Sequence, residues 1–137
     1  MKSYEYFPHT ADVQFRAYGK SLEEAFGNAA YAFTDIITDH TKVTSSIKKT
    51  FKVSAENKEA LLYDFLEYFI FLLDTEGFLL HEIRSIVLQG TTIHGVCMGD
   101  THPEQYEIKA HIKAVTYQQM KIVQKEKLWY VQVIVDV

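Results

Sequence analysis

One stretch of sequence decides the fold class: Asn57-Lys58-Glu59-Ala60-Leu61-Leu62-Tyr63-Asp64-Phe65-Leu66-Glu67-Tyr68-Phe69-Ile70-Phe71-Leu72-Leu73-Asp74. Its apolar residues repeat at helical spacing and predict a single buried arc, made of Leu61, Leu62, Phe65, Leu66, Phe69, Leu72 and Leu73. Asn57 is a favourable N-cap and Gly77 a favourable stop, so we expect a helix that ends near Asp74. The opposite face carries Tyr63, Asp64, Glu67, Phe71 and Asp74.

Upstream of this helix the sequence predicts a second helix and three strands. Ser21 precedes Glu24 by three residues, which is capping-box spacing, and apolar residues then repeat at helical spacing to about Asp39. Short alternating runs predict strands at Tyr4 to His9 and Val13 to Tyr18, around the turn Thr10-Ala11-Asp12, with Gly19 ending the second. A third strand is expected within Thr44 to Ala55.

Downstream of Gly77 the pattern becomes extended. We expect strands at Leu79 to Gln89, Thr92 to Met98 and Tyr106 to Tyr117, then a hairpin of Met120 to Gln124 and Leu128 to Val137. Helices and strands are thus segregated along the chain. This order predicts an α+β fold, largely antiparallel sheet with two main helices in the N-terminal half, over a single domain at 1–137.

Composition excludes several classes of protein. The 137 residues are 47% apolar and 23% charged, a globular balance, and the net charge of −4 disfavours free nucleic acid. Cys97 is the only cysteine, so no internal disulfide is expected. The chain has no apolar run of membrane-spanning length and no apolar signal core at its start, so we expect a cytoplasmic protein without a membrane partner.

The common catalytic and nucleotide-binding motifs are absent. The chain contains neither a GxGxxG nor a GxxxxGK[ST] sequence. His81-Glu82 begins like a zinc-protease motif, but Ser85 stands where the second histidine would be. These absences do not exclude catalysis, but they remove its common routes.

Two acids stand out at opposite ends of the chain. Asp12 lies in the predicted first turn, where an aspartate often satisfies its own backbone. Asp136 ends the most strand-like segment, although strands are depleted in aspartate, and the terminal carboxylate of Val137 lies beside it. A hard cation such as Ca²⁺ or Mg²⁺ would relieve the repulsion between these two groups. A solvated chain end is the alternative.

A basic face is the third candidate feature. If residues 106–117 form a strand, then Lys109, His111 and Lys113 share one face, because side chains alternate along a strand. Such a face could meet phosphates or an acidic partner. An ordinary solvated sheet face is the alternative.

Several motifs occur together in a characteristic order. His9-Thr10-Ala11-Asp12-Val13 is followed by Ala17-Tyr18-Gly19-Lys20-Ser21-Leu22-Glu23-Glu24-Ala25-Phe26, then by Ile112-Lys113-Ala114-Val115-Thr116-Tyr117, and the chain closes on Val135-Asp136-Val137. Over its whole length the chain resembles the archease family. It departs from the family pattern at Gln118, where histidine is frequent, and at Phe65, where tryptophan is frequent.

The resemblance implies a function without catalysis. Archeases are protein cofactors of the RtcB-type RNA ligase of tRNA splicing, and they promote its guanylylation and multiple turnover. The family binds a divalent metal, calcium first with magnesium or manganese as alternatives, and by position its ligands correspond to Asp12, Asp136 and Val137. The implied partner is the ligase, with RNA reached only through it, and the basic face is a candidate contact.

Two other functions stay open from the residues alone. One is a metal-dependent hydrolase using Asp12 and Asp136, although no third side chain is evident as base or nucleophile. The other is a small RNA-binding module using Lys109, Lys113 and Lys121, against which the net charge of −4 counts.

Overall fold

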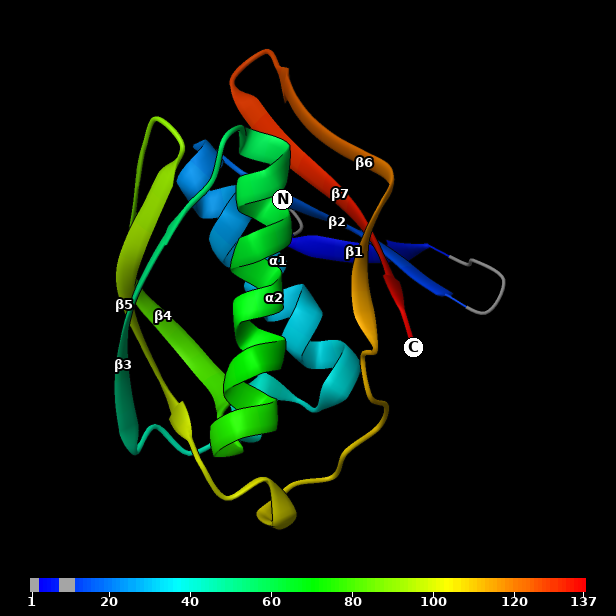
Figure 1. The fold of residues 1–137 in the computed structure, drawn as a ribbon. Helices are drawn as coiled ribbons and strands as arrows, with labels where there is room; N and C mark the ends of the chain where they lie inside the picture. Colours follow the sequence, from blue (N-terminus) through cyan, green and yellow to red (C-terminus); the bar gives the residue numbers. More distant parts are fainter. Residues whose placement is uncertain (1–2, 8–11) are drawn as a thin grey trace.

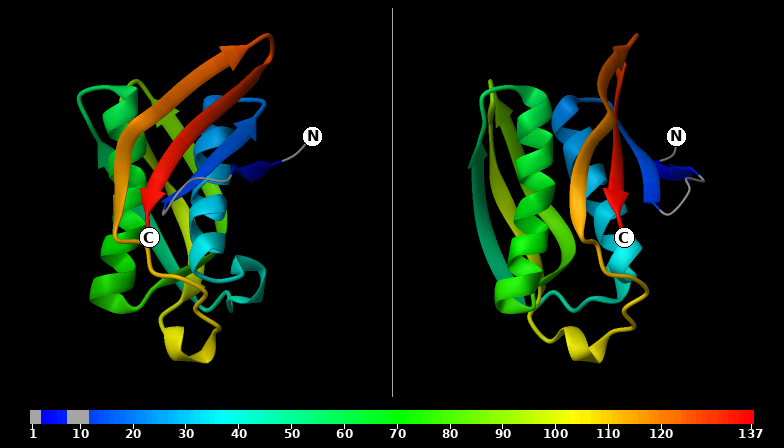
Figure 2. Two further views of the ribbon diagram at one scale, coloured as in Figure 1. Left: turned by 90° about the vertical axis from the view of Figure 1, so that its right-hand side faces the viewer. Right: turned by 45° about the vertical axis from the view of Figure 1, so that its right-hand side comes forward.

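The chain folds into three layers, with two helices held between two sheets. The structure is a computed structural model, and it describes residues 3–7 and 12–137. Helices α1 (Leu22–Ile37) and α2 (Lys58–Glu76) form the middle layer, as Figure 2 shows in its right-hand view. The α+β class predicted from the sequence is confirmed, and the strands are divided between two separate sheets.

All strand pairs in both sheets are antiparallel. The four-stranded sheet has the order β1 (Tyr4–Phe7), β2 (Asp12–Gly19), β7 (Leu128–Asp136) and β6 (Ala114–Lys125). The three-stranded sheet has the order β3 (Ile47–Ser54), β5 (Thr92–Asp100) and β4 (Leu79–Gln89). Two short 3₁₀ helices, η1 (His40–Lys42) and η2 (Pro103–Gln105), lie in connections. Figure 1 shows that strands from both ends of the chain make up the first sheet.

The helix ends follow the predicted chemistry. Ser21 Oγ accepts a hydrogen bond from the Glu24 amide at 3.1 Å, and Asn57 Oδ1 accepts one from the Ala60 amide at 2.8 Å. Gly77 ends α2 with φ +69°, the left-handed conformation that glycine adopts without steric cost. Both caps are confirmed, and α2 continues two residues beyond Asp74.

Aromatic rings fill the space between the helices and the three-stranded sheet. Phe65 on α2 is fully buried, and its ring centroid lies 6.0 Å from Phe26 of α1, 5.5 Å from Phe51 of β3 and 5.3 Å from Phe69. Burying one phenylalanine stabilises a fold by about 1.5–3 kcal/mol. Phe65 therefore links three elements at the centre of the molecule.

The prediction of a strand at residues 106–117 was wrong for most of its length. Residues 106–113 have no regular secondary structure, and β6 begins only at Ala114. The reason is the length of β7, which ends at Asp136 opposite Ala114, so the ladder with β7 begins at Ala114 and is preceded by a hydrogen bond from the Lys113 amide to the Asp136 carbonyl. The segment is nevertheless extended, because its side chains alternate between exposed and partly or fully buried.

The last residues of the predicted strand at 106–117 are continuous with the first strand of the predicted hairpin. Residues 114–125 form one strand, β6, whose pairing with β7 is interrupted between Thr116 and Lys121. Gln119 in this interval has φ 52°, as expected for a residue displaced from a regular ladder. The other predicted strands are confirmed within a few residues, except that positions 8–11 lie outside the described residues. Within the described part of the chain, no helix is long and apolar enough to span a membrane.

A glycine marks a close approach in the three-stranded sheet and gives a test of the packing. A Cβ at Gly95 would lie 2.0 Å from the Ser85 carbonyl oxygen and 2.8 Å from Phe51 Cζ. We expect Gly95→Ala to destabilise the protein by about 3 kcal/mol or more, because backbone cannot move aside cheaply. A Cβ at Gly27 in α1 would meet no described neighbour within 4 Å, so Gly27→Ala should be neutral or stabilise by about 0.5–1 kcal/mol. Urea denaturation of both variants measures the difference, and equal stabilities would contradict this account.

Candidate functional site

Strand pairing places the two predicted acids opposite each other. In the β2–β7 ladder, Asp12 is the direct partner of Asp136. Residues opposite each other on an antiparallel pair point to the same face, with Cβ atoms about 4.5–5.5 Å apart. Both side chains are partly exposed, and Val137 follows Asp136 immediately. Residues from two distant parts of the sequence, Asp12 in one and Asp136 with Val137 in the other, therefore meet at one end of the sheet.

The acid pair lies on the face of the sheet that points away from the helices. Phe15 and Ala17 of β2 and Val133 and Val135 of β7 are buried in the core, which fixes the inner face. Asp12 and Asp136 fall on the alternate positions, together with the pairs Gln14–Ile134, Arg16–Gln132 and Tyr18–Tyr130. No helix of the described structure packs on this outer face, as both views of Figure 2 show.

A network on the same face supports the β6 irregularity. Arg16 Nε donates to Gln132 Oε1 at 2.8 Å, and Gln132 Nε2 donates to the Gln119 carbonyl at 2.7 Å. The Arg16 guanidinium also lies 4.8 Å from the Tyr130 ring centroid, a cation–π distance. Gln132 is buried, and both its side-chain oxygen and its side-chain nitrogen are hydrogen-bonded in this network. Sequence reasoning missed this network because its members are far apart along the chain.

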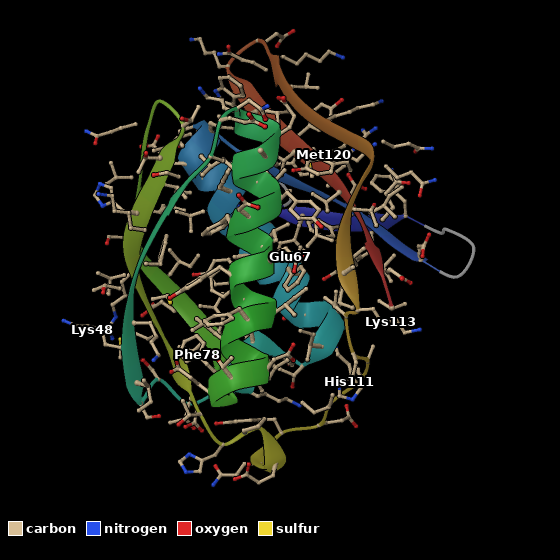
Figure 3. All side chains as sticks on the ribbon, in the orientation of Figure 1. Lys48, Glu67, Phe78, His111, Lys113 and Met120 are labelled. Atoms are coloured by element: carbon tan, nitrogen blue, oxygen red, sulfur yellow. The ribbon has the colours of Figure 1, made fainter. Side chains whose placement is uncertain are left out.

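The segment that carries Lys109, His111 and Lys113, here called the basic segment, is hydrogen-bonded through its backbone to one member of the acid pair of Asp12 and Asp136. The Lys113 amide donates to the Asp136 carbonyl at 2.7 Å, one residue before β6 begins. The Lys109 amide donates to the Ile37 carbonyl at the end of α1, also at 2.7 Å. Lys109, His111 and Lys113 are all exposed. Figure 3 shows His111 and Lys113 at the end of the molecule where β7 finishes, so these basic residues lie near the end of the strand that carries Asp136.

A buried carboxylate anchors the connection that carries these basic residues. Asp100, at the end of β5, is 5% exposed and accepts hydrogen bonds from Tyr106 Oη at 2.5 Å and Ser46 Oγ at 3.0 Å. The Thr101 amide donates to it at 2.8 Å. The hydrogen bond from Tyr106 is the main cause that lowers the pKa of Asp100 to about 2. No periodic pattern in the sequence distinguishes this aspartate from an ordinary strand end.

A second group of metal-ligating types lies elsewhere. Candidate ligand atoms of Asp35, Asp39 and His40 lie within 4.8 Å of one another. Asp35 is already hydrogen-bonded to the Tyr4 hydroxyl, to the His40 amide at 2.9 Å and to His40 Nδ1 at 2.7 Å. Burial raises the pKa of Asp35, but the hydrogen bonds from His40 and Tyr4 outweigh it and hold the pKa below its usual range. These contacts connect β1 and η1 to α1, so the group of Asp35, Asp39 and His40 has a structural role.

Comparison with known proteins agrees with the fold. A model of the Archease protein family (MTH1598/TM1083) matches residues 4–137. The chain belongs to the archease family. Among archeases, that of Methanothermobacter thermautotrophicus is 35% identical over 139 residues, covering 99% of both chains. That of Pyrococcus abyssi is 37% identical over 145 residues, covering both chains completely.

Two solved structures share this archease architecture. The solution structure of Methanobacterium thermoautotrophicum protein 1598 matches with a TM-score of 0.82 and 34% identity, covering all of both chains. The crystal structure of a Thermotoga maritima archease, described as a possible chaperone, matches with a TM-score of 0.64 over 96% of this chain and 94% of its own. At 17% identity the second match supports the archease fold alone.

The Asp100 anchor predicts a pH dependence of stability. We expect Asp100→Asn to destabilise this archease-family protein by about 1–3 kcal/mol at pH 7, because one of the two carboxylate oxygens that accept hydrogen bonds in this buried site becomes an NH₂ donor. The folded pKa of about 2 lies below the unfolded value of about 3.9, so the contribution of Asp100 is present above pH 4 and is lost as pH falls toward 2.

Denaturant unfolding of wild type and variant at pH 7, 4 and 2.5 measures this contribution. The difference between the two proteins should shrink at the lowest pH. Glu104→Gln changes an exposed carboxylate on η2 and serves as the matched control, with an expected effect within about 0.5 kcal/mol. A difference for Asp100→Asn that does not vary with pH would contradict the assignment.

Proposed function

We propose that this protein is a non-catalytic activator of an RtcB-type RNA ligase, and that it promotes guanylylation and repeated turnover of that enzyme. The observation that carries the proposal is the register that sets Asp12 opposite Asp136, with Lys113 bonded to the same residue through the backbone. Membership of the archease family supports the assignment. The absence of a nucleotide-binding motif in the sequence implies that any effect on guanylylation passes through the ligase.

The donor set at the acid pair fits a hard divalent cation. Asp12, Asp136 and the terminal carboxylate of Val137 offer only oxygen ligands, which calcium, magnesium and manganese accept. Like charges placed directly opposite on two strands disfavour the pairing, so a cation between them would stabilise this end of the sheet. We propose that these three residues hold the metal, with calcium as the first ion to test. The bound cation would supply positive charge at the edge of the contact surface.

The basic segment supplies the second part of the proposed contact. Lys109, His111 and Lys113 project from an extended segment that is fixed at Ile37 and at Asp136. Long cationic side chains on an anchored backbone can approach acidic or phosphate-bearing groups near the ligase active site. RNA would then be reached through the ligase, as the overall charge of −4 favours.

Removal of a carboxylate tests the metal site directly. We expect one calcium ion per chain in the wild type, and affinity lower by more than about tenfold in Asp12→Ala and in Asp136→Ala. A C-terminal tag should also weaken binding, because it converts the Val137 carboxylate into an amide carbonyl, whereas an N-terminal tag should have less effect. Isothermal titration calorimetry with Ca²⁺ and Mg²⁺ measures these affinities. Equal binding by all forms would show that the metal, if bound, lies elsewhere.

Charge reversal at Lys113 tests the contact with the ligase. We expect Lys113→Glu to reduce the rate of ligase–GMP formation on the order of tenfold and to change its salt dependence, because a reversed rim charge acts mainly on association. The fold should survive, since the side chain is exposed. Single-turnover guanylylation at two salt concentrations provides the measurement.

The matched control for this charge reversal is Lys48→Glu. Lys48 is exposed on β3, in the sheet on the other side of the helices, and Figure 3 shows it far from Lys113. Lys48→Glu should stimulate the ligase as the wild type does. Full stimulation by Lys113→Glu with unchanged salt dependence would place the contact elsewhere. Failure of the wild type to stimulate any RtcB-type ligase would refute the proposed function.

A further inference from the structure

One side of α2 faces away from the buried core. The buried residues of α2 are Leu61, Leu62, Phe65, Leu66, Phe69 and Leu72. Tyr63, Glu67, Phe71 and Asp74 follow one another at intervals of four, four and three residues, so they lie along the opposite face. Figure 1 shows one side of α2 facing the viewer between the two sheets, and Figure 3 shows Glu67 on that side.

Exposed aromatic rings distinguish this surface. Phe71 is 57% exposed and Tyr117, at the edge of β6, is 54% exposed. The rings of Tyr63 and Tyr117 are stacked, with centroids 4.4 Å apart and an angle of 9° between planes. Phe71 lies two helical turns beyond Tyr63, about 12 Å along the axis. Large exposed rings on a monomer surface often mark interaction sites.

Carboxylates surround these rings. Partial burial raises the pKa of Tyr63, and the hydrogen bond and charge of Glu67 and the charge of Asp64 raise it further. The pKa of Tyr117 is raised by burial and by the charges of Asp64 and Glu56. Within α2 the only basic residue is Lys58, against Glu59, Asp64, Glu67, Asp74 and Glu76, and of these acids Glu76 is paired with Lys49 of β3. We call Tyr63, Asp64, Glu67, Phe71, Asp74 and Tyr117 the acidic aromatic strip.

The stability of α2 does not account for this composition. Asp74 lies in the last turn of the helix, where the macrodipole makes a negative charge unfavourable. The exposed ring of Phe71 gains little from folding. Residues that break local rules without a compensating gain in stability commonly serve a function.

We propose that the acidic aromatic strip docks a segment of a partner protein rich in arginine and lysine. Guanidinium and ammonium groups are attracted both to carboxylates and to the faces of tyrosine and phenylalanine rings. The same negative charge repels RNA and anionic lipid, and a symmetric contact with a second copy would set acid against acid. This inference rests on the proposed function for the identity of the partner, since the ligase is the protein expected to carry the basic segment.

A peptide titration tests the chemistry without the ligase. A hexa-arginine peptide is titrated into isotopically labelled protein, and NMR shifts are followed. We expect shifts centred on Tyr63, Phe71 and Tyr117, lost in the double variant Asp64→Lys/Glu67→Lys and retained in Glu126→Lys, which reverses an exposed carboxylate between β6 and β7. Shifts that are absent from the strip, or that persist in the double variant, would overturn the proposal.

Binding to the ligase then tests the partner. We expect Phe71→Ala and the double variant to weaken ligase affinity by at least about fivefold, as truncation of an interface anchor does. Leu128→Ala removes another exposed hydrophobic side chain, 42% exposed on β7, and should leave affinity within about twofold. Thermal unfolding confirms that each variant is folded.

The outcomes separate the two proposals. If the wild type binds and stimulates the ligase and the strip variants do so equally well, the strip proposal is overturned while the proposed function stands. If the wild type neither binds nor stimulates the ligase, the proposed function fails and the peptide titration alone decides the strip proposal. Sedimentation showing self-association that Phe71→Ala abolishes would make a second copy the occupant, which also overturns the proposal.

Discussion

The antiparallel ladder between β2 and β7 is the interaction on which the rest of the structure depends. It pairs Val13 with Val135, Phe15 with Val133 and Ala17 with Val131, so one run of cross-strand apolar contacts forms the inner face on which α1 packs. The same register fixes the outer face, because side chains alternate strictly along a strand. A shift by one residue would bury Arg16 and expose Phe15. The strand register that buries the hydrophobic core therefore also fixes the position of the acid pair.

The sequence allowed the helices and most strands to be predicted because their signals are local. Caps at Ser21 and Asn57, the stop at Gly77 and the helical spacing of apolar residues each act within a few positions. The failure at residues 106–113 has the opposite cause. Alternation of side chains occurs in any extended chain, but a strand also requires a paired neighbour, and the ladder with β7 begins only at Ala114. The division of the strands into two sheets was likewise not predictable, since it depends on which faces the helices cover.

The candidate site shows the same division. Asp12, Asp136 and Lys113 were found because they break a local pattern or belong to motifs of the archease family, and their proximity followed only from the strand register. Asp100 and Gln132 also hold the structure together, but no local sequence pattern identifies them, because each is hydrogen-bonded to residues from several elements. The acidic aromatic strip could be predicted from the sequence only in part. Its residues lie on the exposed face that helical spacing predicts, but its second tyrosine comes from β6, which only the fold brings beside α2.

The distant origin of the two central strands has a consequence for synthesis of the protein. Arg16 and Gln132, which are hydrogen-bonded across the ladder, are 116 residues apart in the sequence. Closing so long a loop is slow and is rewarded only when both strands are available. While the ribosome still holds β7, the edge of β2 that pairs with β7 is open and the acids at the two ends of the chain are apart. A nascent chain of this protein therefore cannot assemble the acid pair, or the surface proposed to meet the ligase, before β7 has been synthesised.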